Sequence, residues 1–234
     1  MDITESKEDD LRKNDFIGMV SHELKTPLTS LSGYTQLLQL KAKKTEDQFT
    51  ASTLDKVISQ IKKMSTLING FLNVSRLEAG KIYLNKQHFD IVQLIKEVID
   101  DAQLISSSHE IDFDSQFSDT LYADRDKIGN VLSNLLSNAI KYSPRGKHVY
   151  VNCTSADNMI KISVTDEGMG IKPHDVERLF DRYYRVESKH TQQISGFGIG
   201  LYLCAEIIQR HDGFIGVESE VGKGSTFWFT LPNR

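Results

Sequence analysis

A histidine, an acid and a hydroxyl group lie close together near the start of the chain. In the stretch MVSHELKTPLTSL, residues 19–31, His22 and Thr26 are four residues apart, so on a helix they share a face one turn apart. Pro27 has no N–H for the carbonyl of Glu23 and its ring crowds that carbonyl, so the helix should bend or loosen beside His22. A neutral imidazole at this turn would be exposed and nucleophilic. The alternative is a surface histidine on a helix with an incidental proline.

Asparagines recur every four residues in DKIGNVLSNLLSNAIKYSP, residues 126–144. Asn130, Asn134 and Asn138 form a stripe beside the apolar face of a predicted helix, and Lys141 continues that stripe. Asparagine carbonyls are neutral oxygen ligands that suit Mg²⁺, which also binds the phosphates of a substrate, and a lysine supplies a cation for those phosphates. The alternative is a solvated polar stripe on an amphipathic helix.

An aspartate ends the strand-like run MIKISVTD, residues 159–166. Asp166 has the same parity as Ile160, Ile162 and Val164, so the strand turns its carboxylate toward the apolar side. A buried carboxylate without a partner is costly, and a donor from a ligand, such as the amine of a purine, would satisfy it. Gly168 and Gly170 follow at once and allow the backbone close approach. The alternative is an aspartate in an ordinary turn at the end of a strand.

Three alternating glycines open the last predicted helix in SGFGIGLYLCAEIIQ, residues 195–209. Uncapped N–H groups at a helix start bind phosphate, although glycine-rich turns also have purely structural uses. A Walker-type phosphate loop is absent from the sequence, so other groups must bind any nucleotide. The 25 residues between Gly170 and Gly196 are long for a compact loop and predict a mobile lid.

The residues that could carry chemistry stand on elements of two different periods. From about residue 11 to 79 the apolar residues follow a helical period, interrupted by the polar stretch KAKKTEDQ. This pattern predicts two helices of about 30 residues joined by a short turn. So long a hairpin leaves an apolar face exposed, which a second copy would cover in a dimeric four-helix bundle. Packing of the hairpin on the second half of the chain is the alternative.

From about residue 86 the pattern changes to short strands and helices. The runs HVYVNCT, MIKISVTD, GFIGVES and STFWFTLP predict strands, and residues 90–104, 124–142 and 199–211 predict helices. Their alternation predicts helices on one face of a mixed sheet. Gly80 can end the second long helix, so we expect two domains, residues 1–82 and 83–234.

Composition excludes several classes of protein. The chain has 234 residues, of which 39% are hydrophobic and 26% charged, with a net charge of −4, so nucleic acid is an unfavourable partner. Cys153 and Cys204 have no metal-ligand spacing and indicate buried residues in a reducing compartment. No apolar run approaches the ~20 residues of a membrane span, and the N-terminus is no signal peptide. We expect this segment to be cytoplasmic and without membrane contact, even if the full-length protein is attached to a membrane.

The N-terminal motif FIGMVSHELKTPLTSLSGY, residues 16–34, resembles the phosphoacceptor box of bacterial sensor histidine kinases. The resemblance implies that His22 accepts a phosphoryl group and that Glu23 orients and deprotonates its imidazole. It implies further that Thr26 positions water for dephosphorylation of a partner regulator, and that Pro27 is the kink of the family.

The later segments, in their order, resemble the ATP-binding domain of the same kinases, which belongs to the superfamily of DNA gyrase and the heat-shock chaperone. The resemblance implies that Asn138 binds Mg²⁺, that Asn134 supports the metal and phosphates, and that Asp166 holds the adenine amine. The remaining nucleotide contacts that it implies are Lys141 and Tyr142, Gly168 and Gly170 beneath the ring, Gly196, Gly198, Gly200 and Leu201 at the phosphates, and Arg185 at the γ-phosphate. LFDRYYR corresponds to the phenylalanine box of the family, in which Phe180 would anchor the lid, and GKGSTFWFTLP fits its closing strand.

The expected fold is therefore an α+β multidomain one: a long antiparallel helical hairpin, then an α/β sandwich ATP-binding domain of the gyrase and histidine kinase type. The expected activity is that of an ATP-dependent protein-histidine kinase that uses ATP and Mg²⁺, passes its phosphoryl group to an aspartate of a response regulator, and also acts as the phosphatase of that regulator. A homodimer and an upstream sensor domain or protein complete the expected partners. The rival functions are an ATP-gated dimer clamp, which needs no His22, and a non-catalytic docking module, which needs no nucleotide motifs.

Overall fold

The computed structural model describes residues 3–78, 83–105, 109–115, 120–143, 148–186 and 197–233. The side chains of residues 3–18, 21–22, 66, 71, 73–78 and 105 are outside this description. The chain divides into two compact units, Met1–Ile82 and Tyr83–Arg234. Each unit has an architecture of its own.

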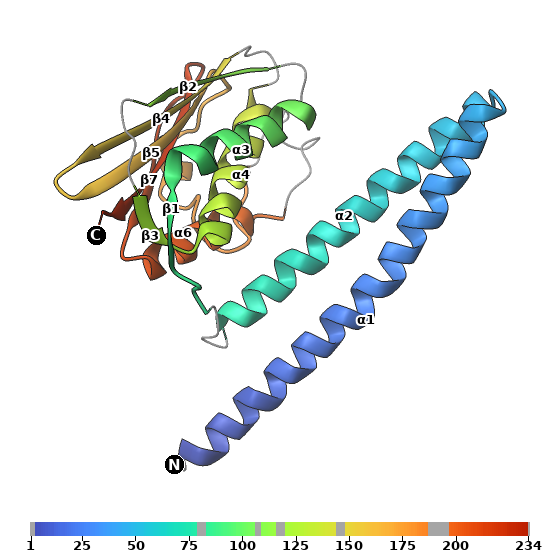
Figure 1. Ribbon diagram of the computed structural model, residues 1–234, viewed down its shortest axis with the longest axis horizontal. Helices are drawn as coiled ribbons and strands as arrows, with labels where there is room; N and C mark the ends of the chain where they lie inside the picture. Colours follow the sequence, from blue (N-terminus) through green and yellow to red (C-terminus); the bar gives the residue numbers. More distant parts are fainter. Residues whose placement is uncertain are drawn as a thin grey trace. The chain divides into compact units, whose positions relative to one another are not determined.

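The first unit is a hairpin of two long helices, α1 (Ile3–Lys44) and α2 (Gln48–Glu78) (Figure 1). The turn between them places Glu46 in the left-handed region at φ 57°. Asp47 then starts α2, because its carboxylate accepts the backbone N–H of Thr50 at 3.0 Å and the Thr50 hydroxyl at 2.7 Å. The sequence prediction of two long helices joined by a short turn is confirmed.

Pro27 lies inside α1, and the helical assignment continues through it from Ile3 to Lys44. Pro27 therefore does not end the helix, and its missing N–H cannot donate to the carbonyl of Glu23. The bend or loosening expected beside His22 stays a prediction. In the following turn, two side-chain hydroxyls hydrogen-bond to backbone carbonyls four residues earlier. Thr29 donates to the carbonyl of Lys25 at 3.0 Å and Ser30 to that of Thr26 at 3.2 Å. Such bonds are compatible with a helix that runs on past a proline.

The second unit contains two sheets and the remaining helices (Figure 1). The larger sheet has the order β2 (Glu110–Ser115), β4 (His148–Ala156), β5 (Met159–Asp166), β7 (Gly224–Pro232), β6 (Phe214–Glu220). β2 and β4 are parallel and the other neighbours antiparallel, so the predicted mixed sheet is confirmed. A separate antiparallel pair joins β1 (Gln87–Asp90) to β3 (Thr120–Ala123). The helices are α3 (Ile91–Ile105), α4 (Arg125–Tyr142), α5 (Pro173–Val176) and α6 (Gly200–Arg210).

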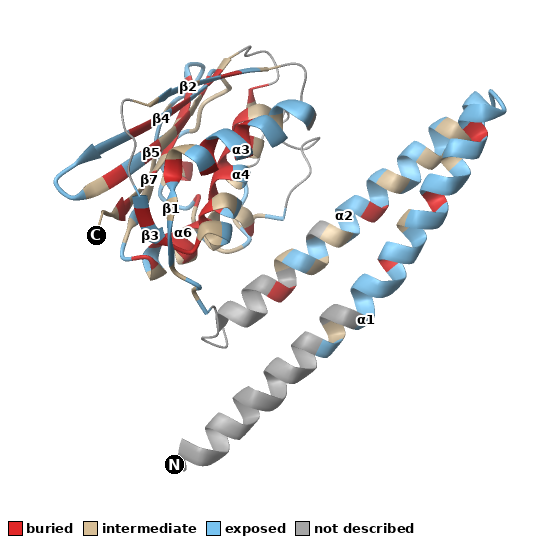
Figure 2. Ribbon diagram, in the orientation of Figure 1, coloured by how far each residue is buried: buried red, intermediate tan, exposed pale blue. Residues whose placement is uncertain are grey.

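The core of the second unit lies between the larger sheet and α3, α4 and α6 on one of its faces (Figures 1 and 2). On β5, the buried residues are those that the alternation predicts, Ile160, Ile162, Val164 and Asp166. On α4 the predicted apolar face is buried along its whole length: Ile128, Val131, Leu132, Leu135, Leu136 and Ala139. The opposite face of α4 is thereby left to carry the asparagines.

A buried histidine ties the start of α4 to the end of α6. Asp124 caps α4 by accepting the N–H of Lys127 at 3.1 Å, and its second oxygen accepts the N–H of Asn85 at 2.8 Å. The N–H of Asp124 donates to Nε2 of His211 at 3.0 Å, and Nδ1 of His211 contacts the carbonyl of Ile207 at 2.8 Å. These bonds fix the two helices at the ends away from Asn138 and Gly200.

The sequence did not predict β1, β2, β3 and α5. β1 and β3 have four residues each, and β2, EIDFDS, alternates apolar residues with acids on an edge of the sheet. Segments this short or this polar contain too few apolar side chains for a periodic pattern in the sequence. Their pairing comes from the sheets around them.

Candidate functional site

The asparagine stripe lies on the face of α4 that does not enter the core. Asn130 is exposed, whereas Asn134 and Asn138 are half-buried. The amide group of Asn138 donates to Oδ1 of Asn134 at 3.0 Å. This bond orients Asn138 with its carbonyl oxygen away from Asn134, and a carbonyl oxygen is the atom that a Mg²⁺ ion would use.

The start of α6 lies directly against this stripe. A Cβ atom on Gly200 would come within 2.4 Å of Nδ2 of Asn134, so a larger residue there would have to displace the amide group of Asn134. The residue before it, Ile199, offers no side-chain cap to the first turn of α6. Uncapped N–H groups therefore begin beside Asn134, and a helix start of this kind favours an anion.

Asp166 is the buried carboxylate that the strand alternation predicts, with only 4% of its surface exposed. Its Oδ1 accepts the N–H of Gly168 at 2.8 Å. Burial raises the pKa of its carboxyl from 3.8 to about 6, although hydrogen bonds from the backbones of Gly168 and Ser225 act to lower it. A donor from a ligand would stabilise the charged form, so the group is suited to accept a hydrogen bond from a base.

The loop after Asp166 meets the end of α4. A Cβ atom on Gly168 would lie 2.4 Å from the carbonyl oxygen of Tyr142, and the N–H of Met169 contacts the same oxygen at 3.4 Å. Burial raises the pKa of Tyr142, and the charge of Arg185 opposes that shift. The structure thus brings Tyr142 and Gly168 together from separate segments.

Lys141 is the cation of the same helix end. Its residue is exposed as a whole, but protein around the amine removes water and lowers its pKa. A partly desolvated ammonium next to the asparagine stripe is an attractive partner for phosphate.

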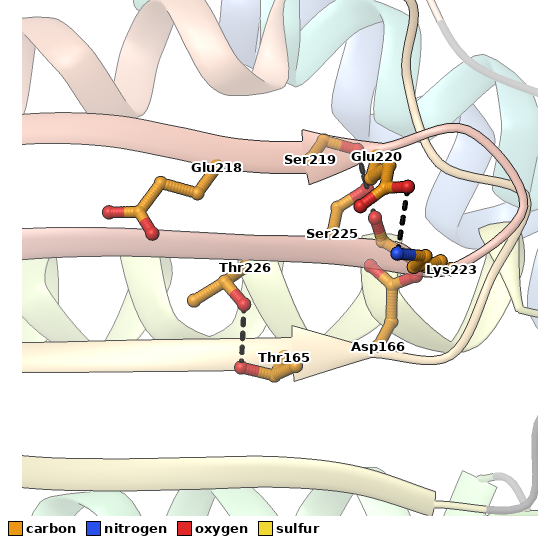
Figure 3. A pocket seen from close by; sticks show the side chains of 9 residues that line it. Thr165, Asp166, Glu218, Ser219, Glu220, Lys223, Ser225 and Thr226 are labelled. Atoms are coloured by element: carbon orange, nitrogen blue, oxygen red, sulfur yellow. Dashed lines mark hydrogen bonds and ion pairs between the residues drawn. The ribbon is translucent and has the colours of Figure 1, made fainter.

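A pocket of about 320 Å³ lies at the ends of β5, β6 and β7 (Figure 3). Its lining includes Asp166 but no residue of α4: Thr165, Asp166, Glu218, Ser219, Glu220, Lys223, Gly224, Ser225 and Thr226. The asparagines and Gly200 are not part of this pocket, so it holds Asp166 alone of the predicted nucleotide residues. The loop after Asp166 packs closely on the end of β6 beside this pocket. A Cβ atom on Gly170, at φ 66°, would lie 2.0 Å from the carbonyl oxygen of Glu220.

The described part of the predicted lid, residues 171–186, is held by several side-chain contacts. Tyr184 donates from its hydroxyl to the buried carboxylate of Asp175 at 2.5 Å, and Arg178 stacks on the Tyr184 ring at 4.3 Å. The N–H of Tyr183 donates to the carbonyl of Gly198 at 2.9 Å, which joins the two described ends of the predicted lid. Phe180 packs half-buried against the core. Gly196 and residues 187–195 lie outside the described residues.

The predicted phosphoacceptor residues lie in the first unit. His22 is in α1, and its side chain is outside the described residues. Glu23 and Thr26 of the same helix are exposed. Their roles stay predictions.

Sequence reasoning missed several polar residues around the site. Ser219, Ser225, Asp175 and Tyr184 all make buried or half-buried hydrogen bonds next to the predicted nucleotide residues. Strand parity could have found the first two, since Ser219 shares a face with Ile215 and Val217, and Ser225 with Phe227. Nothing in the local sequence pairs Asp175 with Tyr184.

A metal at this site would depend on neutral oxygen ligands. Among the described residues, no group of three or more His, Cys, Asp or Glu side chains could hold a metal ion. An asparagine carbonyl together with the phosphates of a nucleotide is the donor set that remains, and it is one that Mg²⁺ accepts. In the same part of the chain, no helix has the length and apolar character needed to cross a membrane.

Two families of known proteins match the chain, one in each of its two units. Residues 12–80 match the His Kinase A (phospho-acceptor) domain, and residues 123–234 match the Histidine kinase-, DNA gyrase B-, and HSP90-like ATPase family. The sensor histidine kinase WalK of Bacillus subtilis is 37% identical over 238 residues, which is 100% of this chain and 39% of that protein. The sensor protein SrrB of Staphylococcus aureus is 33% identical over 237 residues, 99% of this chain and 40% of that protein. The chain therefore spans about 40% of the length of these relatives.

Solved structures give the same picture of the fold. Full-length ShkA in complex with AMPPNP superposes with a TM-score of 0.73 at 27% identity, over 93% of this chain and 45% of that chain. The Acinetobacter baumannii histidine kinase AdeS superposes with a TM-score of 0.63 at 24% identity, over 91% of this chain and 98% of that chain. At that identity the second comparison speaks for the fold alone.

Proposed function

This chain belongs to the sensor histidine kinases and is the catalytic core of a two-component one, and we propose that it moves the γ-phosphoryl group of ATP to His22 and then to an aspartate of a response regulator. The observation that carries the proposal is the convergence in the second unit. The glycine start of α6 meets the asparagines of α4 at Asn134, and the Gly168 loop that follows the buried Asp166 meets the end of the same helix at Tyr142. The first unit supplies the helix that holds His22.

In this proposal the base and the phosphates of ATP bind to different parts of the site. Asp166 accepts the exocyclic amine of adenine, with Gly168 and Gly170 beneath the ring, because a buried carboxylate next to a close-packed loop favours a flat donor. Lys141 and Tyr142 contact the nucleotide beside them.

The phosphates lie toward α6. Gly198, Gly200 and Leu201 present the uncapped first turn of that helix, with Gly196 before them, and Asn134 lies against it. Arg185 extends to the γ-phosphate in this proposal, and its electrostatic effect on Tyr142 supports a location near the end of α4.

The residues fit a Mg²⁺ ion that arrives with ATP. Asn138 would hold it through Oδ1, since its amide group is engaged by Asn134. When bound, the ion neutralises charge that develops on the phosphates during transfer.

Phosphoryl transfer to His22 needs positioning more than covalent chemistry from the protein. A nitrogen of the neutral imidazole forms a bond to the γ-phosphorus in line as the bond to the β–γ bridging oxygen breaks, and ADP leaves with that electron pair. Glu23 orients the ring and accepts the proton of the other nitrogen. The phosphoryl group then passes from His22 to an aspartate of the receiver domain of a response regulator, which regenerates the imidazole.

The residue proposed for dephosphorylation of the regulator lies on the same helix as His22. Thr26, one turn from His22 and exposed on α1, orients water for dephosphorylation of the regulator, so the chain acts as kinase and phosphatase. We further propose a homodimer located in the cytoplasm, with its stimulus arriving from an upstream sensor domain or protein.

Incubation with γ-labelled ATP and Mg²⁺ tests the proposal. A histidine kinase places acid-labile, base-stable label on the chain, because a phosphoramidate hydrolyses in acid. Release of inorganic phosphate without such label would identify an ATP-gated clamp instead. A docking module would give neither product.

A further inference from the structure

Ser219 is a residue of β6 whose hydroxyl joins three segments around the candidate base site. It accepts the N–H of Ile171 at 2.8 Å and donates to the carbonyl of Gly224 at 2.9 Å. It also lies 2.9 Å from the hydroxyl of Ser225, and both serines are labelled in Figure 3. A serine hydroxyl has one proton and two lone pairs, so these three contacts use its whole capacity.

The chemistry of the partners fixes the direction of each bond. The N–H of Ile171 can only donate and the carbonyl of Gly224 can only accept, so the proton of Ser219 goes to Gly224. The hydroxyl of Ser225 must then donate to Ser219. The Ser225 proton is thereby committed, although Ser225 is the partner of Asp166 in the register of β5 and β7.

The segment that Ser219 holds is the loop between Asp166 and α5. One end of this loop is fixed by the bond from Gly168 to Asp166. The other end is fixed to the β6–β7 turn, by the N–H of Gly222 on the carbonyl of Met169 at 2.8 Å and by Ser219 on Ile171. Ser219 supplies a side chain to this attachment, so a single substitution can release Ile171 while the backbone contacts remain.

We propose that Ser219 is a positioning residue for recognition of the adenine base: it anchors the Gly168–Ile171 loop and keeps the Ser225 hydroxyl from donating to Asp166, so that the carboxylate stays directed at the ligand. This inference rests on the proposed function, because it assumes that ATP occupies the site. It adds a residue that touches neither base nor phosphate and acts through Asp166 and the loop.

The other face of the same strands offers a matched control. Thr165 and Thr226 share a hydroxyl–hydroxyl bond of 2.9 Å (Figure 3) one residue away from Asp166 and Ser225, so by alternation they lie on the opposite face of the sheet. Loss of that bond removes a cross-strand hydroxyl contact from β7 without touching the loop.

Calorimetric titration with Mg·ATP and Mg·ITP separates positioning from stability. Inosine carries a carbonyl where adenine carries its amine, so the ratio of the two affinities reports how well Asp166 reads the base. In Ser219→Ala we expect this ratio to fall about 5- to 30-fold relative to wild type, the scale of one or two lost interior hydrogen bonds. Thr226→Ala should keep the wild-type ratio, and Ser219→Thr, which retains the hydroxyl, should restore it to within about 3-fold.

Two outcomes overturn the inference alone: an unchanged ratio in Ser219→Ala, or a parallel loss of both affinities, which marks a purely structural serine. A wild-type chain that binds neither nucleotide overturns the proposed function as well. A wild-type chain that discriminates, with a collapsed ratio only in Ser219→Ala, supports both.

Discussion

The two units of this protein differ in how much of their apolar surface they bury by themselves. In α1, Leu28, Thr35 and Ala42 are buried in the hairpin, seven residues apart, but a parallel stripe at the same spacing is exposed, with Leu31 at 53% and Leu38 at 55%. The second unit instead encloses a continuous core (Figure 2), and the largest fully buried side chains among the described residues all belong to it. The second unit buries its apolar core within one chain, whereas the first leaves an apolar stripe exposed among its described residues, as expected for half of a dimeric bundle.

The second helix repeats the pattern. On α2, Ile61 is buried, whereas Val57 and Met64, again seven residues apart, are 41% and 50% exposed. Two helices that each carry an exposed apolar stripe are covered most simply by a second copy of the hairpin.

This contrast matches the demands of the two tasks. A nucleotide site needs groups held rigidly from several elements, and the α/β core supplies them. In the proposed function a phosphoacceptor has to be reached by a nucleotide site and by a regulator in turn, and a helix with an exposed surface such as α1 suits that requirement.

Substitution of His22 separates the two units most completely. His22→Gln removes the nucleophile of the first unit and leaves the nucleotide site of the second intact, so we expect total loss of autophosphorylation with unchanged ATP affinity. Labelling with γ-labelled ATP and calorimetry measure the two properties. Persistent acid-labile label would mean that another residue is the acceptor.

A charge in the exposed stripe should break the assembly of the first unit. Leu31→Glu keeps helix propensity but places two charges, one from each copy, in the expected interface. Full burial of a leucine stabilises by about 1.5–3 kcal/mol, and two copies lose it, so we expect dimer dissociation to increase about 100-fold or more. Sedimentation equilibrium measures this, with Gln36→Glu, on another face of α1, as control. An equal dissociation constant for both variants would place the interface elsewhere.

Asp166 tests the second unit. Asp166→Asn has nearly the same shape but loses the charge and can turn an amide donor toward the adenine amine, so ATP should bind about 10- to 150-fold more weakly. Asp157→Asn, in the turn at the other end of β5, makes the same charge change away from the site. We also expect wild type to bind GTP poorly, since guanine offers a carbonyl to the carboxylate. Equal ATP affinity in both variants would show that Asp166 does not read the base.

Substitution of Thr26 tests whether the first unit also takes part in dephosphorylation of the regulator. Thr26→Ala should retain autophosphorylation while slowing dephosphorylation of the regulator about 3- to 10-fold, as expected for the loss of one hydrogen bond to water. The half-life of the phosphorylated regulator is the measurement, and Thr29→Ala, one turn further along α1, is the control. If the half-life does not change, Thr26 is only a residue of the helix surface.

The smallest effect concerns the pH dependence of the second unit. His211 is buried, and its Nε2 accepts the N–H of Asp124, so the ring is neutral; burial lowers its pKa, with Lys86 acting in the same direction and Asp124 and Asp212 opposing. The unfolded chain, with an ordinary histidine pKa of about 6.5, binds this proton more readily than the folded one, so His211 should reduce stability as pH falls below about 6.5.

His211→Gln removes this titration. Chemical denaturation at pH 7 and pH 5 should show a smaller loss of unfolding free energy in the variant than in wild type. The raised pKa of Asp166, about 6, acts with the opposite sign, because the folded form binds that proton more readily, but it is common to both proteins and cancels. Identical pH slopes would contradict the assignment of a neutral, acid-sensitive His211.

Local sequence patterns determined much of the molecule. Three patterns depend only on neighbours a few residues apart: the helical period of residues 11–79, the apolar face of residues 126–144 and the alternation that turns Asp166 inward. They can therefore be recognised without knowing the fold. The motifs around His22, Asn138 and Asp166 identified the family for the same reason.

Only the tertiary structure decided which of these faces meet. Gly200 packs against Asn134, 66 residues earlier in the chain, and Gly168 packs against the carbonyl of Tyr142. The hydroxyl of Ser219 accepts the N–H of Ile171, 48 residues earlier. A local pattern shows that a side chain points inward or that a glycine permits close approach, but it does not say what approaches. Sheet order and register decide that, because they depend on how all the apolar faces fit into one core at once.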